Sequence, residues 1–217
     1  MLITATTTCI IIFVSIAFWV WRRKVRKDNK NDDQYAWKLR LSPSERYYLK
    51  NWGSSKHEGT HNITATMQID FKDSDQINYE SFRTNVEYVL RALQLKHPLL
   101  QVGLLYDCAS TSFSCYRDCW YFARKKVVPK IQLEDTNDSW EDAHKHAMNR
   151  SWELDGPFMG VTIAKGEFTK GKLYIVFRFH HVICDASCCS NLVSEFALIL
   201  NDLKHGSGPE SELPCTF

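Results

Sequence analysis

The sequence lacks a strong excess of charge of either sign. In 217 residues, 27 Lys and Arg side chains face 25 Asp and Glu side chains, which gives a formal net charge of +2. Six of the basic residues lie within residues 22–30, so the remainder of the chain carries no basic excess. Internal repeats and low-complexity tracts are also missing. The balance of charge excludes a basic nucleic-acid-binding body, and a hydrophobic share of 44% is typical of a folded globular chain.

Paired Cys-x-x-Cys motifs are missing as well, although the chain has eight cysteines. Cys9 lies in an apolar run, and Cys188 and Cys189 are adjacent on a predicted helix, where they cannot form a regular disulfide framework. Cys108, Cys115 and Cys119 do not have the spacing of a zinc site. We therefore predict small buried thiols in a reduced, cytosolic protein.

Residues 2–21 contain no charged side chain. As a helix this run covers about 30 Å, the thickness of the hydrocarbon core of a bilayer. Trp19 and Trp21 stand where aromatic residues line a membrane interface. A cleaved signal peptide would need a preceding basic residue and a small-residue cleavage site, and a buried core helix would not be followed by six cations. We predict a single transmembrane anchor at residues 1–21.

The cations that follow this run predict its orientation. Lys and Arg next to a span hold that end in the cytoplasm, so residues 22–36 form a basic and polar tether on the cytosolic side. Three Asn-x-Ser/Thr triplets, beginning at Asn62, Asn137 and Asn149, favour the lumenal side more weakly. The prediction is a single-pass protein of the endoplasmic reticulum whose C-terminal body lies in the cytosol.

Residues 37–205 show the alternation of helices and strands that is typical of an α/β unit. Capping boxes of Ser42 with Glu45 and of Ser139 with Asp142 predict helices from Pro43 and over 139–152, and helical spacing of apolar residues predicts helices over 78–95 and 187–203. Apolar alternation or apolar runs predict strands over 63–71, 99–106, 158–164 and 173–182, and residues 120–133 are expected to contain one or two more, around 125–129. Residues 206–217 have the composition of a linker, and we expect this tail to mark a truncation point.

The most informative segment lies between the last strand and the last helix. It contains His180 and His181, followed four residues later by Asp185. Adjacent residues of a strand point to opposite faces, so the two histidines are expected on opposite sides of the sheet. Asp185 falls near the start of the next helix, where a negative charge is favoured. A Ser187–His181–Asp185 triad is not supported, because the chain has no Gly-x-Ser-x-Gly elbow.

This segment resembles the His-His-x-x-x-Asp-Gly motif of a superfamily of CoA-dependent acyltransferases. That superfamily contains chloramphenicol acetyltransferase, condensation domains, alcohol acetyltransferases and wax-ester synthases. Three other segments are similar to the family pattern and occur in the same order. They are Leu41-Ser42-Pro43-Ser44-Glu45-Arg46, His97-Pro98-Leu99-Leu100 and Trp152-Glu153-Leu154-Asp155-Gly156-Pro157-Phe158.

The resemblance implies an N-terminal lobe like that of chloramphenicol acetyltransferase, a mixed sheet with helices packed on it. It also implies that His181 is a general base that takes a proton from a hydroxyl, amine or thiol acceptor as this attacks an acyl thioester such as acyl-CoA. An imidazole has an ordinary pKa near 6.5, which suits this task at neutral pH. Asp185 would be structural, paired with an arginine, and His180 would help to shape the turn. No bound cofactor or metal is implied.

Two positions differ from the family pattern. Ala186 replaces the usual glycine, which matters where the backbone needs a positive φ. Gln101 stands where condensation domains often have the arginine that pairs with the aspartate, and Arg178, Arg40 or Arg46 could replace it. A zinc site is the alternative interpretation of the motif, with the ligands His180, His181, Cys184 and Cys188. A strand followed by a helix does not bring these four side chains to one tetrahedral centre.

The superfamily builds its active site between two lobes, and this chain has the length of one. We expect a truncated acyltransferase, a homo-oligomer, or a non-catalytic half-domain that acts as a binding or regulatory module. The partners expected are therefore a missing C-terminal lobe or a second copy, an acyl thioester and an alcohol-type acceptor. The anchor favours a lipophilic acceptor or membrane lipid, as in wax-ester or acylglycerol synthesis.

Overall fold

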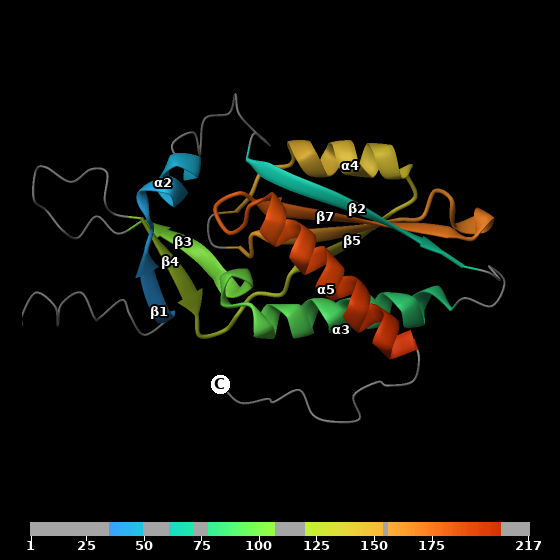
Figure 1. Ribbon diagram of the computed structural model, residues 1–217, viewed down its shortest axis with the longest axis horizontal. Coiled ribbons are helices and arrows are strands. Elements are labelled where there is room, and N and C mark those ends of the chain that lie inside the picture. The colour runs from blue at the N-terminus through green and yellow to red at the C-terminus, as the bar shows by residue number, and fades with distance from the viewer. Residues whose placement is uncertain (1–34, 50–60, 72–77, 107–119, 154–155, 205–217) are drawn as a thin grey trace, which may run out of the picture.

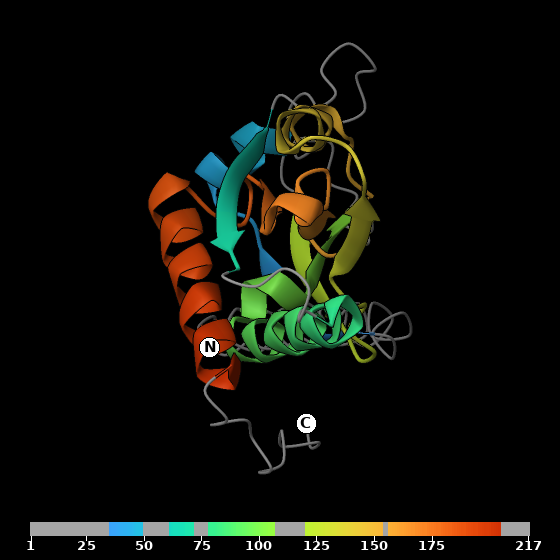
Figure 2. The same ribbon diagram turned by 90° about the vertical axis from the view of Figure 1, so that its right-hand side faces the viewer.

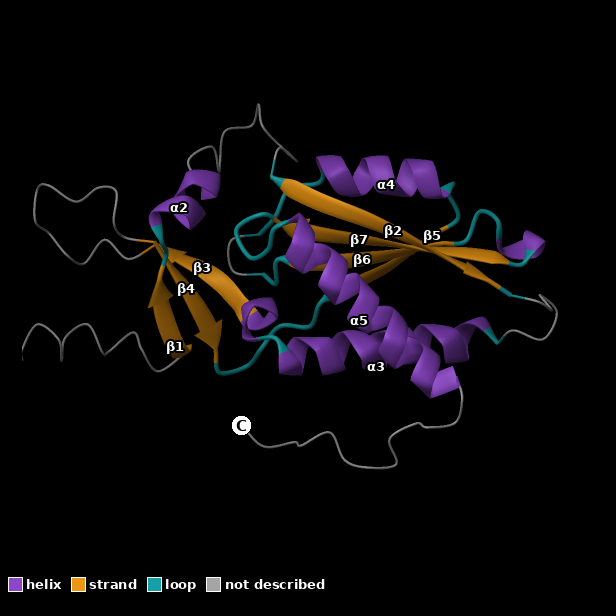
Figure 3. Ribbon diagram, viewed as in Figure 1, coloured by secondary structure: helices purple, strands orange, loops and turns teal. Residues whose placement is uncertain are grey.

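The computed structural model describes residues 35–49, 61–71, 78–106, 120–153 and 156–204, which form two β-sheets and their covering helices (Figures 1 and 3). The predicted anchor at residues 1–21, all but two residues of the predicted tether and the linker-like tail lie outside these ranges. Within them, none of the helices has both the length and the apolar character needed to cross a bilayer. The first strand, β1, begins at Tyr35, two residues before the predicted start of the lobe.

The larger sheet has four strands in the order β2-β7-β6-β5. β7 pairs antiparallel with β2 and β6, while β5 and β6 are parallel, so the sheet is mixed as predicted. Eight consecutive residues of β7 are buried, as the absence of alternation in its sequence predicts for an internal strand covered on both faces. The strands are β2 (Asn62–Asp70), β5 (Gln132–Thr136), β6 (Met159–Ala164) and β7 (Lys172–His180).

Helices cover both faces of this sheet, as the two views show (Figures 1 and 2). On one face, Ala143 and Ala147 of α4 (Trp140–Asn149) pack against Tyr174 and Val176 of β7. The other face is covered by α3 (Tyr79–Lys96) and α5 (Ala186–Lys204) and contains the larger apolar core. The next residue of β7, Phe177, lies in this larger core against Phe196 of α5, so successive residues of β7 serve opposite faces.

The remaining strands form a separate three-stranded sheet in the order β1-β4-β3, so the expectation of one mixed sheet was wrong in this respect. Both pairings in it are antiparallel. It adjoins the short helix α2 at one end of the molecule (Figure 1). Its elements are β1 (Tyr35–Arg40), β3 (Val102–Tyr106) and β4 (Trp120–Lys125), and the helix is α2 (Pro43–Leu49).

Two helix starts follow the predicted capping residues, and a third is capped by Asn78, which was not predicted as a cap. Ser42 and Glu45 form the predicted capping box of α2: the Glu45 carboxylate accepts from the Ser42 backbone N–H, and the Ser42 hydroxyl accepts from the Glu45 N–H at 3.3 Å. At α4, Ser139 accepts from the backbone N–H of Asp142 at 3.2 Å. The Asn78 side chain accepts from Ser81 N–H at 3.2 Å and begins α3. These three helices therefore begin where short polar side chains satisfy their first N–H groups.

Two predicted boundaries differ by three residues from those in the structure. The strand expected over 99–106 begins at Val102, because Pro98–Gln101 forms a 3-10 turn, where the proline needs no N–H partner. Residues 120–133 contain β4 and the first two residues of β5, as expected, but residues 126–131 between them connect the two sheets and are not a strand. The helix expected over 139–152 ends at Asn149.

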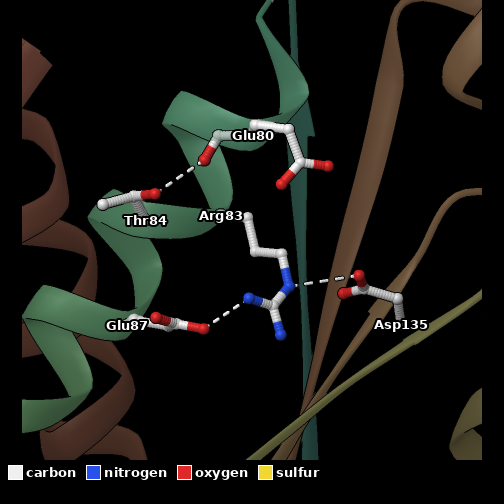
Figure 4. A network of polar contacts seen from close by, with 5 residues as sticks. All are labelled: Glu80, Arg83, Thr84, Glu87 and Asp135. Atoms are coloured by element: carbon white, nitrogen blue, oxygen red, sulfur yellow. Dashed lines mark hydrogen bonds and ion pairs between the residues drawn. The ribbon is translucent and has the colours of Figure 1, made fainter.

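A polar network joins α3 to the edge strand β5 (Figure 4). Arg83 Nε donates to Asp135 Oδ2 at 3.2 Å, and the same guanidinium pairs with Glu87 one turn further along α3. Thr84 Oγ1 donates to the carbonyl oxygen of Glu80 at 2.9 Å. Because these groups are partly exposed, the network contributes little free energy, roughly 1 kcal/mol or less per pair, and mainly fixes the position of α3 beside β5.

Candidate functional site

The candidate site is the turn that connects the central strand β7 to helix α5. His180 is the last residue of β7 and is only 2% exposed. It lies directly opposite Asn62 of β2 in the antiparallel register, and its backbone N–H donates to Phe158 O at 3.0 Å. The backbone that enters the turn is therefore held on both sides by neighbouring segments.

The His180 ring fixes the turn from inside. Its Nδ1 accepts the backbone N–H of Val182 at 3.0 Å, and the backbone N–H of Ile183 donates to His180 O at 3.1 Å. Burial first, and then the nearby positive charge of His61, His181 and Arg178, lower the pKa of His180 to about 3. The ring is thus neutral at neutral pH, with its proton on Nε2 and its Nδ1 lone pair already used.

His181 lies just beyond the end of β7, not inside it, so the strand predicted to reach residue 182 ends two residues earlier. Its backbone N–H donates to His61 O at 2.8 Å, which extends the contact between the two segments by one residue. The side chain is half-buried, in contrast to that of His180. Of the two histidines, His181 is therefore the less buried residue, although its ring atom Nδ1 is itself buried.

Asp185 is exposed and begins helix α5. Its Oδ1 accepts the backbone N–H of Cys188 at 2.7 Å, the contact of an N-terminal capping residue. Among the described residues, no ion pair joins this carboxylate to an arginine. The proposed replacement Arg178 instead donates to the carbonyl oxygens of Arg150 and Ser151, on the α4 side of the sheet.

The two departures from the family motif have local explanations. Ala186 is the first residue of α5, where the backbone is helical, so the position does not require glycine. Gln101 is 5% exposed, and its amide donates to Gln94 O at 2.6 Å and to Leu95 O at 3.3 Å. It caps the last turn of α3 and does not contact Asp185 in the described structure.

Cysteines and a surface groove lie next to the turn. Cys184, Cys188 and Cys189 are free thiols, and burial raises the pKa of each. Within the described ranges, no group of three His, Cys, Asp or Glu side chains is placed to hold a metal ion. A groove of about 390 Å³ runs along α5. Asp185 lines this groove, whereas His180 and His181 do not. The lining residues are His97, Asp185, Ser187, Cys188, Asn191, Leu192 and Glu195.

Sequence reasoning missed the residues behind His180. Trp152 approaches the His180 ring edge-on at 6.2 Å between centroids, and the Arg178 guanidinium lies 3.8 Å from the centroid of the Trp152 ring. Asn62, noted only as a possible glycan acceptor, accepts the Trp152 Nε1–H. Trp152 belongs to one of the segments that resemble the family pattern, but no periodicity in the sequence indicates that Asn62, Trp152 and Arg178 meet.

No protein-family model matches the sequence, and no curated protein matches it either. Solved structures do. The starter condensation domain of the rhizomide synthetase RzmA is 13% identical, with a TM-score of 0.59 over 82% of this chain and 40% of its own. For the condensation domain of the Monacolin K polyketide synthase MokA, the identity is 14% and the TM-score 0.57, over 78% of this chain and 35% of its own.

The chain has the fold of a condensation-domain lobe. A four-domain nonribosomal peptide synthetase bound to AMP and glycine also matches, with 15% identity and a TM-score of 0.51 over 79% of this chain and 12% of its own. At these identities the likeness shows the fold alone, and it confirms the predicted lobe. The chain spans two fifths or less of the chains that it matches.

Proposed function

We propose that the chain is one lobe of a membrane-anchored acyltransferase, which moves an acyl group from a thioester such as acyl-CoA to a hydroxyl or amine acceptor. The observation that carries this proposal is the placement of His181. In a lobe with the condensation-domain fold, its half-buried imidazole follows directly after the central strand and precedes the capped helix α5. His180 cannot take the same role through Nδ1, because that atom accepts the Val182 N–H.

In the proposed reaction, His181 removes a proton from the acceptor as the acceptor oxygen or nitrogen attacks the thioester carbonyl. The tetrahedral intermediate then expels the CoA thiolate, and the imidazolium of His181 returns the proton to that sulfur. The products are an ester or amide and free CoA, and the enzyme ends in its starting protonation state. In support, mutants of the RzmA domain have been solved in complex with C8-CoA, and with C8-CoA together with Leu-SNAC.

A second lobe would complete the site in this proposal. The condensation-domain chains are more than twice as long as the part of them that this chain matches. The remaining half would come from a C-terminal lobe or from a second copy of this chain. The charge-free run at residues 2–21 would hold the site at a membrane, which favours a lipophilic alcohol or a lipid as acceptor.

Acceptor-dependent release of CoA tests the function. We expect the full chain, in detergent or membranes, to release CoA thiol from octanoyl-CoA or a longer acyl-CoA when a long-chain alcohol or diacylglycerol is present. Hydrolysis of the acyl-CoA without an acyl acceptor should be much slower, because His181 then has no bound hydroxyl or amine from which to remove a proton. A product ester should appear in equal amount. The same rate with and without acceptors would contradict acyl transfer.

A topology test addresses the proposed orientation. Because six cations follow the predicted span, we expect a tag at Phe217 to stay cytosolic and Asn137 and Asn149 to carry no glycan. These two side chains are exposed and could accept one in the lumen. A mobility shift removed by a glycan-cleaving enzyme would place the body in the lumen. Asn62 is a poor reporter, since its amide is engaged with α4.

A non-catalytic half-domain is the second candidate, and the surroundings of Asp185 favour it. Within the part of the chain that the structure describes, Asp185 caps α5 and pairs with no arginine, and Gln101 stands at the arginine position of the family pattern. A lobe that no longer maintains this pair could serve as a binding or regulatory module. This candidate predicts a stable folded chain that binds acyl-CoA but transfers nothing.

A further inference from the structure

Three side chains from separate segments are joined on the α4 face of the larger sheet. They are Asn62 on β2, Trp152 after α4 and Arg178 on β7. The Trp152 Nε1–H donates to Asn62 Oδ1, and the Arg178 guanidinium stacks on the Trp152 ring. We refer to these three residues as the clamp. Its members are far apart in the sequence and meet only because β2, β7 and the end of α4 are adjacent.

The clamp holds the C-terminal end of α4. The Asn62 amide donates to the carbonyl oxygens of Ala147 at 3.2 Å and of Met148 at 2.9 Å. Asn62 and Arg178 both donate to the carbonyl of Arg150, at 2.9 Å and 3.2 Å. The last carbonyls of a helix lack partners within the helix and carry partial negative charge, so an amide and a guanidinium are favourable partners. The segment that carries Trp152 is thereby fixed to the sheet.

Arg178 is held in one orientation by its surroundings. It is only 5% exposed, and burial lowers its pKa to about 10, so it remains charged. Gly160 of β6 lies opposite it in the register, and a Cβ there would come within 3.3 Å of an Arg178 terminal nitrogen. The missing side chain of Gly160 therefore leaves space for the guanidinium, which lies over the Trp152 ring.

The clamp is in direct contact with the ring that fixes the candidate site. Trp152 meets the His180 ring edge-on, at an interplanar angle of 76°. Phe158 contacts the same ring at 5.6 Å between centroids. Rotation of the His180 ring would break the 3.0 Å bond from Val182 N–H to Nδ1, and that bond sets the direction in which the chain leaves β7.

We infer that Asn62, Trp152 and Arg178 are positioning residues, which hold the His180 ring and through it the turn that carries His181. The inference rests on the proposed acyltransferase function, in which His181 must meet the acceptor hydroxyl or amine. None of the three touches His181 in a described contact, so they act through His180 and the Val182 N–H. A base displaced by about 1 Å can lose on the order of 100-fold in rate, so a loosened clamp would lower kcat.

Kinetics of the full chain give the first test. Asn62→Ala removes the amide that joins Trp152 to α4, and Trp152→Phe keeps a ring beside His180 but removes the N–H donor. We expect each to lower kcat by roughly 10- to 100-fold with little change in KM, at a temperature where circular dichroism shows both folded. Asn149→Ala is the matched control: its amide also donates to a carbonyl of α4, that of Lys145, without contacting Trp152.

Amide hydrogen exchange gives a second readout that needs no activity. In Asn62→Ala and Trp152→Phe, exchange at Val182 should accelerate at least about tenfold relative to Ile175 in the middle of β7, and in Asn149→Ala it should not. Unchanged Val182 exchange would overturn the clamp, and faster exchange with unchanged kcat would overturn its positioning role. A wild-type chain without acyl transfer would contradict the proposed function, while Val182 exchange would still decide the clamp.

Discussion

Replacing His181 by alanine is expected to lower the rate of acyl transfer by about 10²–10⁴-fold, the usual contribution of a general base. The temperature of thermal unfolding should stay nearly unchanged. The His181 side chain is half-buried, and its backbone N–H, which donates to His61 O, is kept in the variant. The measurement is acceptor-dependent CoA release at saturating acyl-CoA, with circular dichroism melts of the same preparations.

Asp185→Ala distinguishes the loss of a catalytic base from the loss of a structural contact. It removes the side chain that caps α5, so we expect a loss of about 0.5–2 kcal/mol of stability together with reduced activity. Asp185→Ser retains a capping oxygen and should recover most of both. Full transferase activity in His181→Ala would contradict the role of general base, whatever Asp185→Ala does.

Phe177→Ala should cause the largest loss of stability, about 3–5 kcal/mol. Phe177 is fully buried on β7, its ring lies edge-on to Phe196 at 5.0 Å and it stacks beside Phe179 at 6.5 Å. Truncation would leave a cavity between the sheet and α5 that neighbouring strands cannot fill by moving. In a chain of this size, the melting temperature would fall by roughly 6–20 °C.

Leu198→Ala is the control for this effect. Leu198 is on the same helix as Phe196 but is 66% exposed, so its replacement should change stability by less than about 0.5 kcal/mol. Urea unfolding followed by tryptophan fluorescence measures both variants. Equal losses in the two would mean that α5 does not cover β7 as described.

The sequence was sufficient where one segment determines its own structure. The run of Leu173 to Phe179, which is apolar except for Arg178, predicted an internal strand, and the structure places β7 between β2 and β6. Ser42 and Ser139 predicted the starts of α2 and α4 because a cap is a contact over three residues. Local signals of this kind need no knowledge of which segments pair.

What depends on distant pairing could not be predicted. Periodicity gives the faces of a strand but not its neighbour, so the division into two sheets was missed. From the sequence, Asn62 could only be described as part of a glycosylation triplet. Its pairing opposite His180 and its hydrogen bonds at the end of α4 are seen only in the structure. Arg178 interrupts an apolar strand, and its burial is explained by the carbonyls and the Trp152 ring that tertiary structure brings to it.

In the proposed function, this lobe forms half of an acyl-transfer site. Its most direct test is size-exclusion chromatography with light scattering on residues 35–217, with acceptor-dependent transfer from octanoyl-CoA measured across the peaks. We expect the lobe to self-associate, because the face that a second lobe would cover is expected to be apolar, and we expect transfer to elute with a symmetric oligomer or to appear when a second lobe is added. A stable, folded monomer that transfers no acyl group under either condition would contradict the account and favour the binding half-domain.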